Sequence, residues 1–534
     1  MKRKNRRAAW LSGLLALAML AGIAGCASKN TDTDGGVLYS EEPGSIAYEM
    51  TDNASAPQWK ADSEPEEGYP GFNTEEYGSI TENPFMSVKS SPLSTFSADV
   101  DTASYANIRR MLSSGSYPLP EQVRIEEMLN YFTYDYPQPA GEEPFSVTTE
   151  IGPCPWNAQT KLMLIGLQAK KVDMEDAPLS NLVFLIDVSG SMDEPNKLPL
   201  VKQAFLLLTE EMRPQDRISI VTYASQEKVV LEGATGEDKD KIMTAIENLT
   251  AGGATAGSKG IQTAYEIGER FFIEGGNNRI ILATDGDLNV GVTSEGALKR
   301  LVEEEREKGI FLSVLGFGMG NIKDNKMETL ADNGNGNYAY IDTILEAKKV
   351  LVEEMGGTLF TVAKDVKLQV EFNPEKIKGY RLIGYENRML AAEDFADDKK
   401  DAGEIGAGHR VTALYELVEA DSDFEINDAE LKYQKTETVG SEDWLTVNIR
   451  YKEPDGDESK LLTYPVTGEA AATDNLTFAA AVAETGLLIR NSQYKGEAAY
   501  EQVITALESV EGLSEDVYKD EFLYLVKKLS RMEK

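Results

Sequence analysis

Residues 182–192 read LVFLIDVSGSM, and this stretch decides the fold. Residues 182–186 form a continuous apolar run, which is typical of a strand buried on both faces of a parallel sheet. Asp187, Ser189 and Ser191 follow at once, so the turn after the strand carries one carboxylate and two hydroxyls. Ligands of such sheets bind at the carboxyl ends of the strands. We therefore expect a binding site at residues 187–191.

The strand–helix pattern continues on the C-terminal side of this stretch. Strands are expected at 217–223, 279–283 and 310–317. Helices are expected at 198–212, 237–249, 258–272, 295–308 and 343–354. Alternation of this kind predicts a parallel sheet wrapped by helices.

The flanks have a different pattern. Helices at 102–112 and from Pro120 to 129, then strands at 145–151 and 162–168, precede the alternating region. After it come strands at 366–372, 380–385, 411–419, 444–451 and 460–465, and then helices near 476–490, 498–507 and 514–532. Neither set of strands obviously completes a two-sheet core alone. Because the ends of inserted domains often lie close together, we expect the two sets to pair into one β-sandwich.

Two more loops at the same sheet edge carry oxygen ligands. A glycine-rich run at 249–255 ends in Thr255, and the strand at 279–283 is followed by Thr284-Asp285-Gly286. Carboxylate and hydroxyl oxygens are hard donors that suit Mg²⁺, Mn²⁺ or Ca²⁺. The candidate metal ligands are Asp187, Ser189, Ser191, Thr255 and Asp285.

This set resembles the von Willebrand factor type A (VWA) family, with its metal-ion-dependent adhesion site. The family pattern is D-x-S-x-S, a downstream Thr, and an Asp after the fourth strand. The resemblance implies a Rossmann-like, doubly wound, mostly parallel sheet in an α/β fold, and a divalent cation on the five residues. Mg²⁺ is favoured, with Ca²⁺ and Mn²⁺ as alternatives. The pattern does not assign the neighbouring polar residues Asp193, Glu194, Asp287 and Asn289, which we interpret as solvated loop residues.

The charges of these ligands favour a partner that carries an acid. Two aspartates neutralise a divalent cation, the hydroxyls add no charge, and Mg²⁺ readily keeps water at open positions. An Asp or Glu of a protein partner could replace such a water. In the alternative interpretation, the Ser-Gly-Ser turn merely caps the helix that starts near Leu198.

The N-terminus has the pattern of an export signal. Residues 1–25 contain five bases and no acid, and an apolar run follows the bases. The run ends in Ile23-Ala24-Gly25-Cys26, which resembles the bacterial lipobox and implies a diacylglycerol anchor with palmitate chains on Cys26; an uncleaved membrane anchor is the alternative. Residues 26–92, rich in acidic and small residues, are predicted to be a disordered tether.

Composition excludes several classes of protein. The chain has 534 residues, with 53 Lys and Arg against 90 Asp and Glu, which gives a net charge of −37. Nucleic-acid binding is excluded because phosphate contacts need a basic surface. Two cysteines cannot form a disulfide framework, and one histidine excludes a multi-histidine metal site.

Three features suggest catalysis only weakly. Asp99-Val100-Asp101-Thr102 resembles the motif of haloacid dehalogenase-like phosphatases, but Asp101 is more economically a helix N-cap. Cys154 is interpreted as a buried small hydrophobic residue. His409 lies in a predicted turn, and no G-x-S-x-G elbow accompanies it. We expect no enzyme.

The flanks resemble an uncharacterised group of bacterial proteins that combine a dedicated N-terminal region, a central type A domain and a C-terminal domain of unknown function. The similar segments are 96–105, 124–132, 379–386, 406–409 and 413–416. The expected order of parts is 1–25 signal peptide, 26–92 lipidated tether, 93–176 N-terminal region, 177–356 VWA domain, 357–470 β-sandwich region and 471–534 C-terminal helices.

The combined expectation is a lipoprotein on the extracytoplasmic side of the cell membrane. It would bind a protein partner through its metal, in adhesion or in assembly of a complex at the cell surface. The alternatives are a structural or signalling scaffold regulated by the metal, and a hydrolase.

Overall fold

Strand β5 (Ser180–Asp187) is the strand expected from the first quoted stretch, and in the computed structural model all eight of its residues are buried. It lies inside a six-stranded sheet of order β10-β9-β8-β5-β6-β7, in which β7 alone is antiparallel. The other strands are β6 (Arg217–Tyr223), β7 (Lys228–Thr235), β8 (Asn277–Thr284), β9 (Ile310–Phe317) and β10 (Tyr338–Ile341). The predicted parallel sheet is confirmed.

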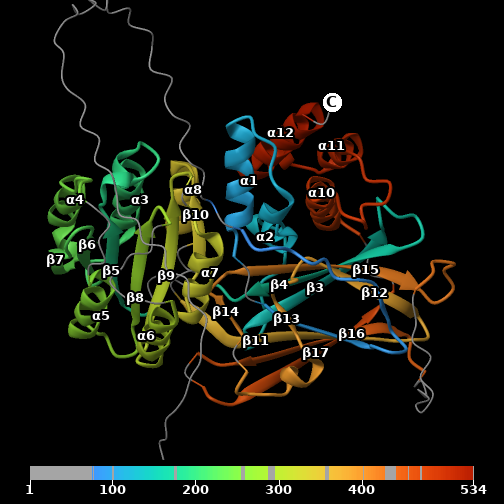
Figure 1. Cartoon of the computed structure of the whole chain (residues 1–534). Coiled ribbons are helices and arrows are strands. Elements are labelled where there is room, and N and C mark those ends of the chain that lie inside the picture. The colour runs from blue at the N-terminus through green and yellow to red at the C-terminus, as the bar shows by residue number, and fades with distance from the viewer. Residues whose placement is uncertain are drawn as a thin grey trace, which may run out of the picture. The chain divides into compact units, whose positions relative to one another are not determined.

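Helices cover both faces of this sheet (Figure 1). One face packs against α3 (Leu198–Glu211), α4 (Lys239–Glu247) and α8 (Ile344–Lys348). The other packs against α5 (Gly260–Arg270), α6 (Glu295–Glu307) and α7 (Asp324–Asn333). Shorter helical turns are η2 (Gly190–Asp193), η3 (Gly236–Asp238) and the π-helix η4 (Lys349–Glu353). We call residues 177–354 the α/β domain.

The structure describes residue 75 and residues 77–98, 101–172, 177–253, 259–286, 295–320, 322–354, 360–400, 402–426, 440–454, 456–468 and 472–532. All of them belong to one compact unit, Pro70–Lys534. The expected signal peptide, Cys26 and most of the expected tether lie outside the described residues.

Two antiparallel sheets form a sandwich beside the α/β domain (Figure 1). The first has the order β1-β12-β15-β4-β3, with β1 (Met86–Ser87), β3 (Phe145–Pro153), β4 (Lys161–Ala169), β12 (Ile377–Ile383) and β15 (Arg410–Glu419). The second has the order β13-β2-β11-β16-β17, with β2 (Leu93–Ser97), β11 (Thr361–Phe372), β13 (Met389–Leu390), β16 (Asp443–Lys452) and β17 (Ser459–Thr467); β14 (Gly403–Gly406) pairs with β11. Because β4 pairs with β15 and β2 with β11, the expected joining of the two flanks is confirmed.

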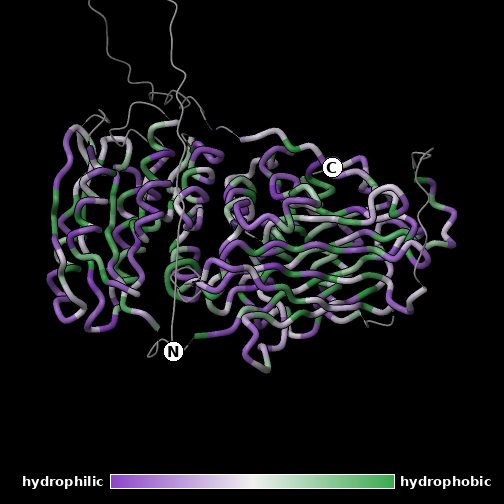
Figure 2. The backbone as a smooth tube through the Cα atoms, turned by 90° about the horizontal axis from the view of Figure 1, so that it is seen from below, coloured by the Kyte–Doolittle hydropathy of each residue, from purple (hydrophilic) through white to green (hydrophobic). Residues whose placement is uncertain are grey.

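Side chains along the strands of the first sheet point alternately to its two faces, and each face contributes to a different hydrophobic core. Met163 and Ile165 of β4 face the interior of the sandwich, whereas Leu162 and Leu164 face helices on the outside. These helices are α1 (Ala103–Ser113), α2 (Ile125–Tyr131), α10 (Asp474–Ile489), α11 (Tyr500–Ser509) and α12 (Val517–Met532), with the turns η1 (Pro120–Gln122) and η6 (Leu513–Glu515). Turn η5 (Ala392–Phe395) lies beside β2 and β11. Figure 2 shows hydrophobic residues running along the strands of both sheet systems.

Two expectations for the N-terminal region were wrong. The tether was expected to be disordered up to residue 92, but β1 pairs with β12, and Glu75 forms an ion pair with Arg110. Acidic side chains here find buried basic partners, which composition alone does not reveal. Asp101 is not the cap of α1, which begins after Thr102; its carboxylate instead accepts from the Tyr338 backbone N–H at 3.0 Å.

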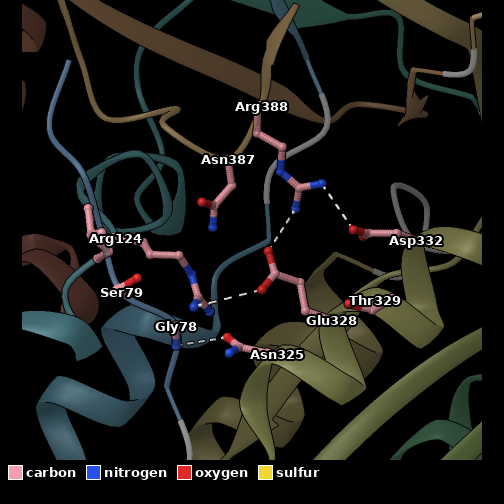
Figure 3. Close-up of a pocket in the computed structure, with 10 residues that line it drawn as sticks. Gly78, Ser79, Arg124, Asn325, Glu328, Thr329, Asp332, Asn387 and Arg388 are labelled. Atoms are coloured by element: carbon pink, nitrogen blue, oxygen red, sulfur yellow. Dashed lines mark hydrogen bonds and ion pairs between the residues drawn. The ribbon is translucent and has the colours of Figure 1, made fainter. Parts of the chain in front are cut away.

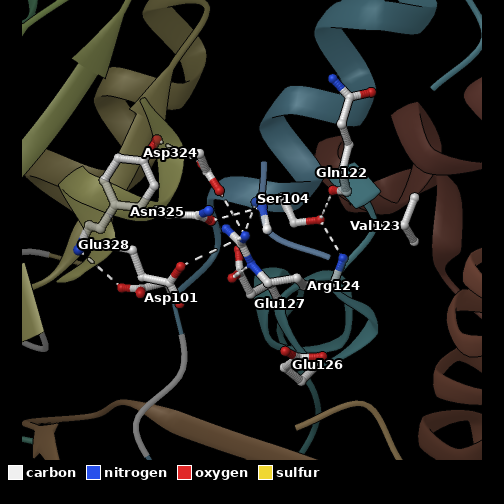
Figure 4. A network of polar contacts seen from close by, with 12 residues as sticks. Asp101, Ser104, Gln122, Val123, Arg124, Glu126, Glu127, Asp324, Asn325 and Glu328 are labelled. Carbon is white, nitrogen blue, oxygen red and sulfur yellow. Dashed lines mark hydrogen bonds and ion pairs between the residues drawn. The ribbon is translucent and has the colours of Figure 1, made fainter. Parts of the chain in front are cut away.

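A buried network of charges joins the α/β domain to the N-terminal region (Figure 4). Arg124 lies between Glu127, which it contacts through Nε, and Asp324 of α7, whose Oδ2 is 2.7 Å from Nη1. Ser104 connects α1 to the same network, because its Oγ accepts from the Arg124 backbone N–H at 2.9 Å. The partners of these charges are all buried, so losing one of them would leave another charge uncompensated inside the protein. These contacts therefore fix the α/β domain to the N-terminal region in a specific way.

Candidate metal centre

Asp187 is the last residue of β5, and its side chain is completely buried. The backbone turns sharply after it, so that the Ser189 N–H donates to Asp187 Oδ1 at 2.8 Å. This bond fixes one carboxylate oxygen. Burial raises the pKa of Asp187 to about 6, and the nearby charge of Asp285 adds to the rise.

The two serines of the motif lie side by side. Ser189 Oγ and Ser191 Oγ are 3.0 Å apart, with Ser189 buried and Ser191 exposed. The glycine-rich loop holds this turn from the other side, because the Gly190 N–H donates to the Gly253 carbonyl at 2.9 Å and the Gly252 N–H donates to the Val188 carbonyl at 2.8 Å. The loop that leads to Thr255 therefore contacts the serine turn, although Thr255 itself lies outside the described residues.

Asp285 reaches the same place from the neighbouring strand. It directly follows β8, which pairs in parallel with β5, and its side chain is buried. Lys197 connects it to the serine turn: Lys197 Nζ donates to Asp285 Oδ2 at 3.1 Å and to the Ser191 carbonyl at 3.0 Å. The structure thus brings Asp187, Ser189, Ser191 and Asp285 together at one sheet edge.

The oxygens left without partners fit a cation. Asp187 Oδ2 and Asp285 Oδ1 are both buried, and neither accepts a hydrogen bond of normal geometry within the described residues, although the buried Tyr223 hydroxyl lies near the Asp187 carboxylate. Buried carboxylate oxygens normally accept hydrogen bonds or bind a cation, and burying them without such a partner costs free energy of folding. A divalent cation bound by these oxygens and by the serine hydroxyls would satisfy them. The donors are hard oxygens, as Mg²⁺, Mn²⁺ or Ca²⁺ require.

Sequence reasoning missed Lys197. A lysine in the loop before a helix is normally taken to be solvated, yet this side chain is only 5% exposed. Its position in the sequence could have indicated this burial. Lys197 follows the second serine by six residues and directly precedes the apolar helix α3, where the chain must cross the sheet edge.

The residues considered for catalysis lie in surroundings typical of residues that support the fold. Cys154 is buried, and burial raises the pKa of its thiol to about 12, with a further rise from the charge of Glu416. A thiol with a raised pKa is a poor nucleophile. His409 lies in the turn between β14 and β15, and its carbonyl accepts from the Ala169 N–H at 2.9 Å. Asp287 and Asn289 lie outside the described residues, as does Asp99.

A polar cavity of about 330 Å³ lies away from the metal centre, between α7, the segment at residues 78–80 and the loop before β13 (Figure 3). Glu328 is its centre, with Oε1 3.4 Å from Arg388 Nη2 and Oε2 3.8 Å from Arg124 Nη1. Arg388 also pairs with Asp332 at 3.2 Å. The charges in this cavity neutralise one another across the junction, so it joins parts of the fold and does not present a free charge to a ligand.

Two absences hold for the described residues. Within this part of the chain, no three or more His, Cys, Asp and Glu side chains gather as a metal cluster, so the candidate centre depends on two aspartates and on hydroxyls. No helix in the same residues has the length and apolarity needed to cross a membrane.

Known families match consecutive parts of this chain. Residues 71–164 match the family described as von Willebrand factor, residues 181–353 match the von Willebrand factor type A domain, and residues 357–532 match the C-terminal domain of the uncharacterized protein YfbK. YfbK of Escherichia coli (strain K12) is 42% identical to this chain over 467 residues, which cover 85% of this chain and 80% of that protein. The chain belongs to the YfbK family. In this family member, the α/β domain with the candidate metal centre is a VWA domain, a kind of domain that commonly mediates protein interactions through a metal site.

Other similarities are confined to part of this YfbK-family chain or are distant. The uncharacterized protein sll0103 of Synechocystis is 32% identical over 183 residues, 34% of this chain and 42% of that protein. Among solved structures, a von Willebrand factor type A protein from Catenulispora acidiphila covers 74% of this chain and 92% of its own, with 17% identity and a TM-score of 0.39. Proximal thread matrix protein 1 from the mussel byssus, solved with a zinc-occupied MIDAS motif, covers 33% of this chain and 45% of its own, with 20% identity and a TM-score of 0.27.

Proposed function

We propose that this protein binds a protein partner through a divalent cation, Mg²⁺ in the first place, held by Asp187, Ser189, Ser191, Thr255 and Asp285. The observation that carries the proposal is the pair of buried carboxylate oxygens, Asp187 Oδ2 and Asp285 Oδ1, that have no hydrogen-bond partner among the residues the structure describes. An Asp or Glu of the partner would complete the coordination of the cation. The protein then acts by binding and not as an enzyme.

The place of action in this proposal is the extracytoplasmic face of the cell membrane, where lipid on Cys26 anchors the chain. The support comes from the N-terminal sequence, in which bases, an apolar run and the lipobox-like residues 23–26 follow one another. Two acyl chains give stable anchoring because each buried CH₂ contributes about 0.8 kcal/mol. Substituting Cys26→Ser should release the protein from the membrane fraction of cells, and a protein that stays there would contradict the anchor.

The metal-dependent step is tested in two stages. Isothermal titration of the purified chain with Mg²⁺ should show one site, and Asp187→Ala should abolish it. Asp193→Ala is the matched control, because Asp193 is an exposed acid of the same turn and is not among the proposed ligands. Crosslinking on intact cells should then capture a partner in Mg²⁺ but not after chelation, and equal capture by wild type and by Asp187→Ala would contradict the proposal.

The second candidate is a scaffold in which the metal controls conformation without touching an acidic ligand. It is favoured by the buried charges that fix the α/β domain to its flanks, such as Arg124 and Asp324. The two functions differ in the crosslinking result. A scaffold would capture the same partner with its metal bound or removed.

A further inference from the structure

Lys197 is held inside the candidate metal centre. Its ammonium contacts the Asp285 carboxylate at 3.1 Å and the Ser191 carbonyl at 3.0 Å, and its side chain is 5% exposed. A third neighbour, Glu194 Oε1, is 3.6 Å away but 60% exposed, so its attraction is largely screened by water. The charge of Lys197 is therefore compensated mainly by one of the two buried aspartates of the centre.

The loop after β9 is shaped around this lysine. Gly318 has a φ of +80°, and a Cβ at this position would lie 2.4 Å from Lys197 Cε and 2.7 Å from its Cγ. A side chain at Gly318 would expel the lysine stem, and the left-handed backbone is itself suited to glycine. The buried position of Lys197 is thus supported by two separate elements, the loop before α3 and the loop after β9.

The two carboxylate oxygens of Asp285 have different surroundings. Oδ2 accepts from Lys197, while Oδ1 is buried and has no partner in the described residues. Without the lysine, the two aspartates would give the centre a charge of −2, and a divalent cation would bring it to zero. With the lysine, the charge is −1 before the cation binds and +1 afterwards.

We propose that Lys197 is a built-in cation that weakens the affinity of the centre for its divalent metal and leaves the loaded centre positive, so that it attracts a carboxylate of the partner. This inference rests on the proposed function and names the residue that tunes it. Two cations close to one carboxylate repel each other in a buried site, where the effective dielectric constant is lower than in water. Removing the lysine should therefore strengthen metal binding and weaken carboxylate binding.

The opposite signs of the two effects give the test. Mn²⁺ is titrated into the full chain and free Mn²⁺ is followed by EPR; acetate is then titrated into the loaded protein as a carboxylate probe, followed by water-proton relaxation. Lys197→Gln keeps hydrogen-bond donors for Asp285 and Ser191 but removes the charge. We expect Mn²⁺ to bind about tenfold to a hundredfold more tightly, and acetate several-fold more weakly.

Further variants separate charge from folding. Lys197→Met is a second neutral variant should Lys197→Gln not fold, and Lys197→Arg, which keeps the charge, should bind Mn²⁺ nearly as the wild type does. Lys239→Met is the control, because Lys239 is a partly exposed lysine of the same domain and contacts the Glu210 carbonyl. Unchanged or weaker Mn²⁺ binding by the neutral variants would overturn the inference. Wild-type protein that binds no Mn²⁺ would instead contradict the proposed function.

Discussion

Arg109 of α1 and Glu346 of α8 form a buried ion pair, with Nη2 2.7 Å from Oε2 and both side chains at most 2% exposed. The same guanidinium also pairs with Asp342 and donates to the Tyr131 hydroxyl at 2.9 Å. Arg109 thereby joins the N-terminal helices to the end of the VWA domain. Its Nη1 is also 3.2 Å from Oε2 of Glu521 in α12, so this guanidinium ties together three parts of the chain.

Substituting Arg109→Met should strongly destabilise the protein. The change would deprive the buried carboxylates of Glu346 and Asp342 of the guanidinium that pairs with both, a loss that typically costs about 3–5 kcal/mol. Urea unfolding of the full chain measures it. Lys161→Met is the control, because its pair with Glu419 is about one-third exposed and should contribute about 1 kcal/mol or less. Equal losses in the two variants would contradict the role given to Arg109.

Asp187→Asn should remove the stabilisation of the protein by its metal. In the metal-free protein, the variant removes one of two buried like charges, so it should be at least as stable as the wild type. Only the wild type should gain from Mg²⁺, by about 2.7 kcal/mol at a concentration of one hundred times Kd. Thermal unfolding with and without Mg²⁺ measures both effects. A variant that gains as much from Mg²⁺ as the wild type does would exclude Asp187 as a ligand.

Glu484 in α10 should make stability fall as the pH rises. Burial raises the pKa of this carboxyl from 4.5 to about 7 in the folded chain, while its backbone partner, the Ala499 N–H at 3.1 Å, opposes the rise. Between those two values the unfolded chain is ionised and the folded chain holds the proton, so stability is lost across this window and not regained above it. Below pH 4.5 both states are protonated and no penalty remains.

The measurement compares Glu484→Gln with the wild type at several pH values. The variant keeps an acceptor for Ala499 and should be about 1–3 kcal/mol more stable at pH 8, with no difference near pH 4.5. Glu501→Gln, an exposed change on α11, should match the wild type throughout. A constant difference between variant and wild type over the whole range would rule out titration of Glu484.

The elements that could be predicted from sequence are those whose own residues determine them. Strand β9 was expected at 310–317 and lies there, because an apolar run bounded by Gly309 and Gly318 permits little else. β7 and α7 were missed because at least half of their residues are polar or glycine, and β10 was missed because it is only four residues long; all three are placed by neighbouring strands and helices. The helix expected from Pro120 divides into η1 and α2, because the Arg124 side chain turns into the buried charge network between them.

The residues of the candidate site also fall into those that the sequence predicts and one that it does not. Asp187, Ser189, Ser191 and Asp285 were found because a motif at the end of a buried strand fixes their place. Lys197 was not, because its burial depends on Gly318, which is more than one hundred residues away in sequence and contacts it only in the fold.

The C-terminal part that matches a family of its own, residues 357–532, should not fold alone. Its strand β11 pairs with β2, and its strand β15 pairs with β4, so both would lose a neighbour inside a sheet. An isolated fragment of residues 360–534 should therefore lack a cooperative unfolding transition and give poorly dispersed NMR spectra. Unpaired inner strands expose backbone groups and apolar faces that only the N-terminal strands cover.

Restoring those strands should restore the fold, even without the VWA domain. The two ends of that domain meet at Arg213, whose Nη1 donates to the Ala177 carbonyl at 2.6 Å and whose guanidinium lies 6.0 Å from the Phe360 ring. A short Gly/Ser linker from residue 176 to residue 360 can therefore replace the domain. We expect residues 77–176 joined in this way to 360–534 to unfold cooperatively. Cooperative folding of 360–534 by itself would show that the sandwich does not need both flanks.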